Sequence, residues 1–152
     1  MNLLLVQHGQ AKTREEDPAM PLNADGERAV GQMARWLATT GTRVDEIRHS
    51  VKERARQTAA AFAQHLSPEP AVKEITGLKP MEDVLTVADG LKGYQGSLML
   101  VGHLPFMSRL TGLLVTGDPE REVVQFRNAG VVCLSDEGGR WQMSWAVVPD
   151  LL

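Results

Sequence analysis

Several residue types and patterns are scarce in this chain, and each scarcity excludes a class of protein. The 152 residues include one cysteine, Cys133, which cannot form an internal disulfide and fits a reducing compartment. Aromatic residues make up 5% of the chain, and we interpret Trp36, Trp141 and Trp145 as core packing rather than a stacking platform. The formal net charge of -3 provides no broad cationic field, so we expect no nucleic-acid partner.

Long apolar runs are also missing. No stretch approaches the roughly 20 apolar residues that a membrane-spanning helix needs. The chain passes from Met1 straight into a short strand-like run, without the basic segment and apolar core of a secretory signal. We therefore expect a soluble, cytoplasmic protein with no membrane partner.

Motifs for metals and nucleotides are absent as well. No pair among the four histidines has local metal-ligand spacing, and the cysteine stands alone. The chain contains no glycine-rich dinucleotide loop and no Walker-type loop. We therefore expect neither a metal site nor a nucleotide site of the usual kinds.

What the chain does contain is an alternation of short apolar runs with segments of helical periodicity. The runs 3–6 and 97–101 are the strongest strand candidates, because each is almost entirely apolar and is followed by a histidine. Weaker strands are expected at 44–50, 71–75, 131–134 and 141–147. This order predicts an α/β protein, a three-layer α/β/α sandwich with a mostly parallel sheet and an antiparallel edge.

Each of the four expected helices has a start signal and a stop signal in the sequence. Ser50 and Glu53 have the spacing of a capping box, in which both side chains satisfy backbone donors of the first helical turn. The other starts are a capping residue or a proline at the first turn. The boundary signals are Asn23 and Gly41 for the first helix, Ser50 and 67–70 for the second, Pro80 and Gly93 for the third, and Pro105 and Gly117 for the fourth.

Three strand-to-helix junctions carry side chains suited to one ligand. His8 follows the first strand, Ser50 and Arg54 follow the second, and His103 follows the run 97–101. The carboxyl ends of parallel strands share one edge of a sheet, where ligands bind, so these residues are expected to converge. An arginine in the first turn of a helix suits a phosphate, and a neutral histidine is a competent nucleophile for a phosphoryl group. Taken singly, His8 is equally well explained as a core or turn histidine, and Ser50 better explained as a helix cap.

Four segments in order resemble the motifs of the histidine phosphatase superfamily, also called phosphoglycerate mutase-like. Residues 6–9 (VQHG) are similar to its Arg-His-Gly signature, and 50–59 (SVKERARQTA) to a serine followed by Arg-Ala-x-Gln-Thr. Residues 101–105 (VGHLP) resemble its Gly or Ser then His-x-Pro motif, and 21–26 its Pro-Leu-Thr-x-x-Gly stretch. The resemblance covers essentially the whole chain, and the small size is most similar to SixA-type phosphohistidine phosphatases.

This resemblance implies a single histidine phosphatase-like domain over residues 1–152, with the phosphoglycerate mutase-like fold and no cofactor. It further implies that His8 is phosphorylated during turnover, that Arg54 and His103 bind the phosphoryl oxygens, and that water releases phosphate. The implied partner is a protein that carries phosphohistidine, or a small phosphate substrate. The implied phosphate-binding residues are Gln7, Gly9, Ser50, Arg54 and His103.

Two positions depart from the family pattern. The family has arginine where this chain has Gln7, and SixA-type members often have arginine where this chain has Met20. Gln7 can donate one hydrogen bond but supplies neither a charge nor a bidentate fork. Loss of such a charged contact costs roughly two orders of magnitude in rate. Candidates to compensate are Lys12, Arg14 and Arg127.

The sequence offers two candidates for a general acid, Glu82 and Asp83, although acids near a helix start also interact favourably with its dipole. Without a dedicated acid, the chemistry favours a labile P–N bond, whose imidazole leaving group is readily protonated. The leading hypothesis is therefore a phosphohistidine phosphatase. The alternatives are a module that binds phosphate or a phosphoprotein without catalysis, and a phosphatase acting on a small phosphate ester or anhydride.

Overall fold

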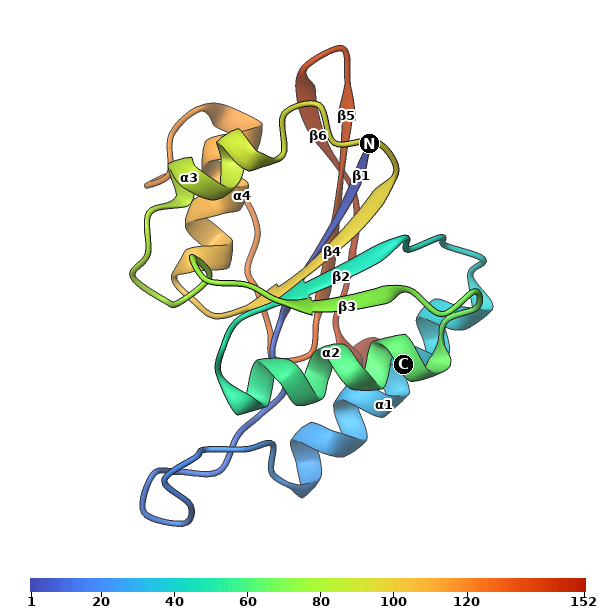
Figure 1. Ribbon diagram of the computed structural model, residues 1–152, viewed down its shortest axis with the longest axis vertical. Helices are drawn as coiled ribbons and strands as arrows, with labels where there is room; N and C mark the ends of the chain where they lie inside the picture. Colours follow the sequence, from blue (N-terminus) through green and yellow to red (C-terminus); the bar gives the residue numbers. More distant parts are fainter.

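Six strands form one mixed sheet in the computed structural model, which describes residues 1–152 (Figure 1). The strand order is β3-β2-β4-β1-β5-β6, with β1 to β4 parallel and β5 antiparallel to both of its neighbours. The elements are β1 (Asn2–Gln7), α1 (Ala24–Thr39), β2 (Glu46–His49), α2 (Glu53–His65), β3 (Ala71–Glu74), α3 (Val84–Gly90), β4 (Ser97–Gly102), α4 (Phe106–Thr116), β5 (Val131–Glu137), β6 (Arg140–Val147) and the 3-10 helix η1 (Pro149–Leu151).

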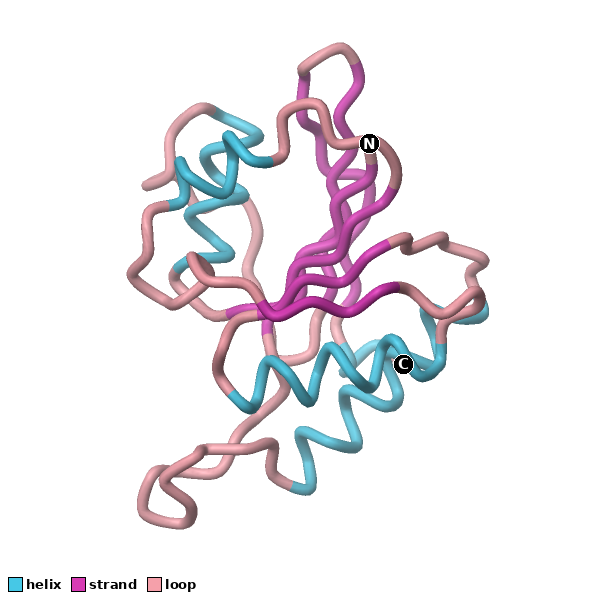
Figure 2. The backbone as a smooth tube through the Cα atoms, in the orientation of Figure 1, coloured by secondary structure: helices cyan, strands magenta, loops and turns pink.

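The two faces of the sheet pack against different pairs of helices, because successive side chains of a strand point to opposite faces. In β1, Leu4 and Val6 join the core formed with α1 and α2. Leu3 and Leu5 join the core formed with α3 and α4. Figure 2 shows the helices on both sides of the strands, which confirms the predicted layers and the antiparallel edge. None of the helices combines the length and the apolar character that crossing a membrane requires.

Several predicted boundaries are confirmed by local geometry. Asn23 caps α1, because its side-chain oxygen accepts a hydrogen bond from the Gly26 N–H at 2.7 Å. Gly117 ends α4 with a φ of 81°, a left-handed conformation that glycine adopts readily. Gly138 and Gly139 have φ values of 65° and 81°, as required by the tight turn that joins β5 to β6.

Two predicted helix starts are wrong. Ser50 and Glu53 form no capping box: Lys52 occupies the cap position of α2 without a side-chain cap bond, and the Ser50 hydroxyl is hydrogen-bonded to His103 instead. Helix α3 does not begin at Pro80 but at Val84, because the Asp83 carboxylate accepts the Leu85 N–H at 2.9 Å. In the first case a distant partner has replaced a local one, and in the second a capping side chain fixed the start after the proline.

Candidate active site

The carboxyl ends of β1, β2 and β4 bring the three predicted junctions together. Strands β1 and β4 are neighbours in the sheet (Figure 1), and the rings of His8 and His103 lie with their centroids 5.0 Å apart. Arg54, in the first turn of α2, places its Nε 3.4 Å from Nε2 of His8. Residues far apart in the sequence thus meet at one edge of the sheet.

His8 is held in a single protonation form by its neighbour. Its Nδ1 lies 2.7 Å from the carbonyl oxygen of Gly9, which can only accept a hydrogen bond, so Nδ1 carries the proton. Burial lowers the pKa of His8, the hydrogen bond to Gly9 opposes this, and the charge of Arg54 lowers the pKa further. The net pKa is below the ordinary value. His8 is therefore neutral at neutral pH, with the lone pair of Nε2 on the side of Arg54.

A network of hydrogen bonds fixes the backbone around His8. The Gly9 N–H donates to Oγ1 of Thr58 at 3.1 Å, and the Thr58 hydroxyl donates to the carbonyl of Arg54 at 2.8 Å. From the loop before β5, Nδ2 of Asn128 donates to the carbonyl of His8 at 3.0 Å. The sequence predicted Thr58 only as a core-facing helix residue, although it lies in the second motif, and no pattern singled out Asn128.

The turn after β1 is also confined by packing. A side chain at Gly9 would meet a methyl group of Val30 at 2.6 Å, so the close approach to α1 requires glycine. On the other side, the N–H of the buried Ala129 donates to the carbonyl of Gln7 at 2.9 Å. Ala129 has a φ of 65°, a conformation that a residue with a side chain adopts only at some cost in energy. Both contacts restrict where His8 can lie.

His103 is the most enclosed polar group of the site. Its side chain is 2% exposed, and Nε2 lies 2.8 Å from the hydroxyl of Ser50, which is fully buried. Burial, followed by the charges of His8, Arg54 and Lys52, lowers the pKa of His103 to about 3. Its other nitrogen, Nδ1, is buried without a hydrogen-bond partner. His103 is therefore a neutral ring with one polar atom still unsatisfied.

The position that departs from the family pattern, Gln7, lies on the other face of the sheet from His8, if the alternation of β1 continues. Its side-chain oxygen is buried and has no hydrogen-bond partner. The three cations predicted to compensate, Lys12, Arg14 and Arg127, are exposed, and none makes a hydrogen bond or ion pair with the site. Arg54 is thus the guanidinium that contacts His8.

The two candidate acids differ in position. Asp83 is engaged as the cap of α3. Glu82 is exposed and lines a hollow of about 100 Å³ together with Ser50, Leu78 and Lys79. Of the two carboxylates, Glu82 therefore adjoins the site. No cluster of three or more His, Cys, Asp or Glu side chains is arranged to hold a metal ion.

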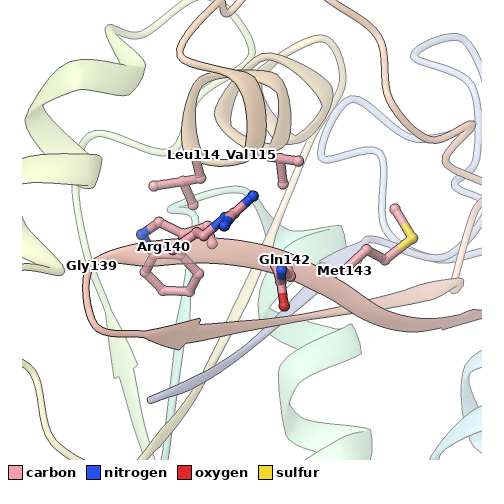
Figure 3. Close-up of a pocket in the computed structure, with 7 residues that line it drawn as sticks. Leu114, Val115, Gly139, Arg140, Gln142 and Met143 are labelled. Atoms are coloured by element: carbon pink, nitrogen blue, oxygen red, sulfur yellow. The ribbon is translucent and has the colours of Figure 1, made fainter.

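A larger hollow lies elsewhere, between α4 and β6 (Figure 3). Its volume is about 650 Å³, and Arg140 is its one charged side chain. None of the predicted site residues lines it, and it offers no histidine or carboxylate for phosphoryl chemistry. The lining residues are Leu114, Val115, Gly139, Arg140, Trp141, Gln142 and Met143.

Comparison with known proteins gives matches of three kinds. Residues 3–81 match the family model of the histidine phosphatase superfamily, branch 1. An uncharacterized protein of Picosynechococcus sp. is 29% identical over 150 residues, which cover 93% of this chain and 89% of the relative. A broad-specificity phosphatase of Saccharomyces cerevisiae is 27% identical over 163 residues, covering 94% of this chain and 68% of the relative. The solved structure of the protein histidine phosphatase SixA complexed with tungstate has a TM-score of 0.87 and 24% identity, over 99% of both chains.

Proposed function

The chain belongs to the histidine phosphatase superfamily, and from that premise we propose that it is a phosphatase that turns over through a phosphohistidine on His8. The preferred substrate in this proposal is phosphohistidine in a protein. One observation carries it: a neutral histidine, with its Nδ1 proton held by the Gly9 carbonyl, has its Nε2 3.4 Å from the guanidinium of Arg54. A nucleophile and a phosphate-binding cation thus face the same point.

The proposed reaction has two displacements. The Nε2 lone pair of His8 forms a bond to phosphorus as the bond to the leaving group breaks, while Arg54 binds the phosphoryl oxygens. The Gly9 carbonyl accepts the Nδ1 proton throughout and so stabilises the positive charge that the phosphorylated ring acquires. Water then attacks phosphorus, phosphate leaves, and neutral His8 is regenerated.

The supply of acids supports a P–N substrate over an alkyl phosphate. No carboxylate makes a hydrogen bond to His8, Arg54 or His103, and Asp83 is used as a helix cap. An imidazole leaving group takes up a proton readily, whereas an alkoxide needs an acid placed beside it. Glu82 is the residue we propose as that acid if an ester is cleaved.

The proposal is tested by turnover and by trapping. Wild type, His8→Ala and Gln7→Arg are incubated with a protein that carries labelled phosphohistidine and, separately, with an aryl phosphate. We expect phosphate release by wild type, none above background by His8→Ala, and a gain of about tenfold to a hundredfold for Gln7→Arg, which restores a charge to the site. His65→Ala, a change of histidine at the far end of α2, is the matched control and keeps wild-type activity.

Label trapped on His8 after an acid-free quench supports the mechanism, and label on another residue contradicts it. Wild type that matches His8→Ala on every substrate contradicts the enzyme proposal.

Gln7 favours a second candidate, a phosphate-binding module without turnover. Its amide supplies no charge, and its buried oxygen has no partner. That candidate predicts binding of inorganic phosphate in the absence of phosphate release from any substrate. Likeness to the broad-specificity phosphatase of Saccharomyces cerevisiae favours a third, a phosphatase for small phosphate esters, for which the aryl phosphate is the test.

A further inference from the structure

The contact between Ser50 and His103 is fixed from several sides. The Ser50 hydroxyl lies 2.8 Å from Nε2 of His103, and the N–H of Lys52 donates to the same hydroxyl oxygen at 3.4 Å. The backbone of Ser50 is fixed as well: its N–H donates to the carbonyl of Val101 at 3.1 Å, and its carbonyl accepts from Nδ1 of His49 at 2.8 Å. Ser50 therefore has little freedom to turn away from His103.

Counting protons decides which nitrogen of His103 carries one. The Ser50 hydroxyl has two polar neighbours, the Lys52 N–H, which only donates, and Nε2 of His103. If Nε2 carried the proton and donated to Ser50, the serine proton would have no acceptor, and Nδ1 would be a second unsatisfied atom. If Nδ1 carries it, the serine proton is donated to Nε2, and only the Nδ1–H is left without a partner. The second arrangement leaves one buried group unsatisfied in place of two, and each such group is costly.

The remaining unsatisfied group is then a donor, at the position where a phosphoryl group is expected. We infer that Ser50 is a positioning residue that holds neutral His103 in its Nδ1–H form, so that this buried ring donates a hydrogen bond to a phosphoryl oxygen. This inference rests on the proposed function, because it assigns the ligand of His103 from it. With the other proton placement, a nitrogen lone pair would face the phosphoryl oxygens and repel them.

The same placement explains how His103 works as a neutral group. Burial, then His8, Arg54 and Lys52, keep the ring uncharged at neutral pH. A neutral ring assists phosphate binding only if the nitrogen facing the phosphate carries the proton. Ser50 thus acts through His103, in addition to any contact of its own with phosphate.

The test combines a proton assignment with a binding measurement, and neither requires turnover. Nitrogen NMR of the histidine rings assigns the proton of His103 in wild type, Ser50→Ala and Ser50→Cys, and titration with inorganic phosphate gives a dissociation constant for each. Ser97→Ala is the matched control, because Ser97 is buried at the other end of β4 and its hydroxyl has no partner.

We expect the proton on Nδ1 in wild type and in Ser97→Ala. In Ser50→Ala we expect a mixture of both forms and phosphate binding weakened by about tenfold, the effect of one lost hydrogen bond. A proton on Nε2 in wild type overturns the inference, and this reading needs no variant to fold. Unchanged proton placement and affinity in Ser50→Ala also overturn it. Absence of phosphatase activity alongside the expected NMR and binding results would instead reject the proposed turnover and leave the role of Ser50 standing.

Discussion

Mild acid is expected to destabilise the fold through His103 before it acts on the carboxylates. The pKa of this ring is about 3 in the folded protein and about 6.5 when unfolded. Between these values the unfolded chain binds one more proton than the folded one, so stability is fully present above about pH 6.5 and is lost as pH falls toward 3. Each pH unit in this window costs about 1.4 kcal/mol, or about 2 kcal/mol between pH 6.5 and 5.

Urea unfolding followed by tryptophan fluorescence measures this loss. The pKa of His8 is also below the ordinary value, so the wild-type slope includes a contribution from His8. The variant His103→Gln keeps a polar group beside Ser50 but removes one titrating ring, and it is expected to lose less stability than wild type by about 2 kcal/mol over the same range. His65→Gln controls for the loss of a histidine outside the site. A wild-type stability that does not change between about pH 6.5 and 5, or an equal slope in His103→Gln, would refute the reasoning.

Three further outcomes follow from single contacts. Because the pKa of His8 is lowered, the acid limb of kcat/KM should have its midpoint below about pH 6.5, and a midpoint above that value in a pH–rate profile contradicts a neutral nucleophile. Thr58→Val keeps the shape of the side chain but leaves the Gly9 N–H without an acceptor, which should cost about 1 to 3 kcal/mol in urea unfolding and weaken phosphate binding. Asp83→Ala should cost about 1 kcal/mol in unfolding free energy through the lost cap, with kcat unchanged, and a fall in kcat would instead make Asp83 a catalytic acid.

The parts of the fold that the sequence predicted correctly are those with a regular hydrophobic pattern. Strands β1 and β4 are buried on both faces, so their runs of apolar residues mark them clearly. The predicted starts of α2 and α3 failed, because short spacings say nothing about competing partners. The Ser50 hydroxyl found an acceptor 53 residues away, which no local capping rule contains.

The same distinction applies to the site. His8, Arg54 and His103 were predicted because each follows a strand, and the topology of a parallel sheet brings such positions to one edge. Thr58 and Asn128 were not, because their contacts with the turn at His8 span 49 and 120 residues. These contacts depend on the side-chain positions of two packed elements, which an apolar pattern does not specify.

The charge of the site now bears on the meaning of Gln7. His8 and His103 are neutral at neutral pH, so Arg54 is the one full positive charge in contact with the nucleophile. Gln7 adds no charge, and the neighbouring cations considered for that role stay exposed. The remaining support for a phosphoryl group consists of hydrogen-bond donors held in fixed positions, which stabilise a transferring group without reorganisation. A site of this kind depends on where its protons are held, and it therefore depends on Gly9 for His8 and on Ser50 for His103.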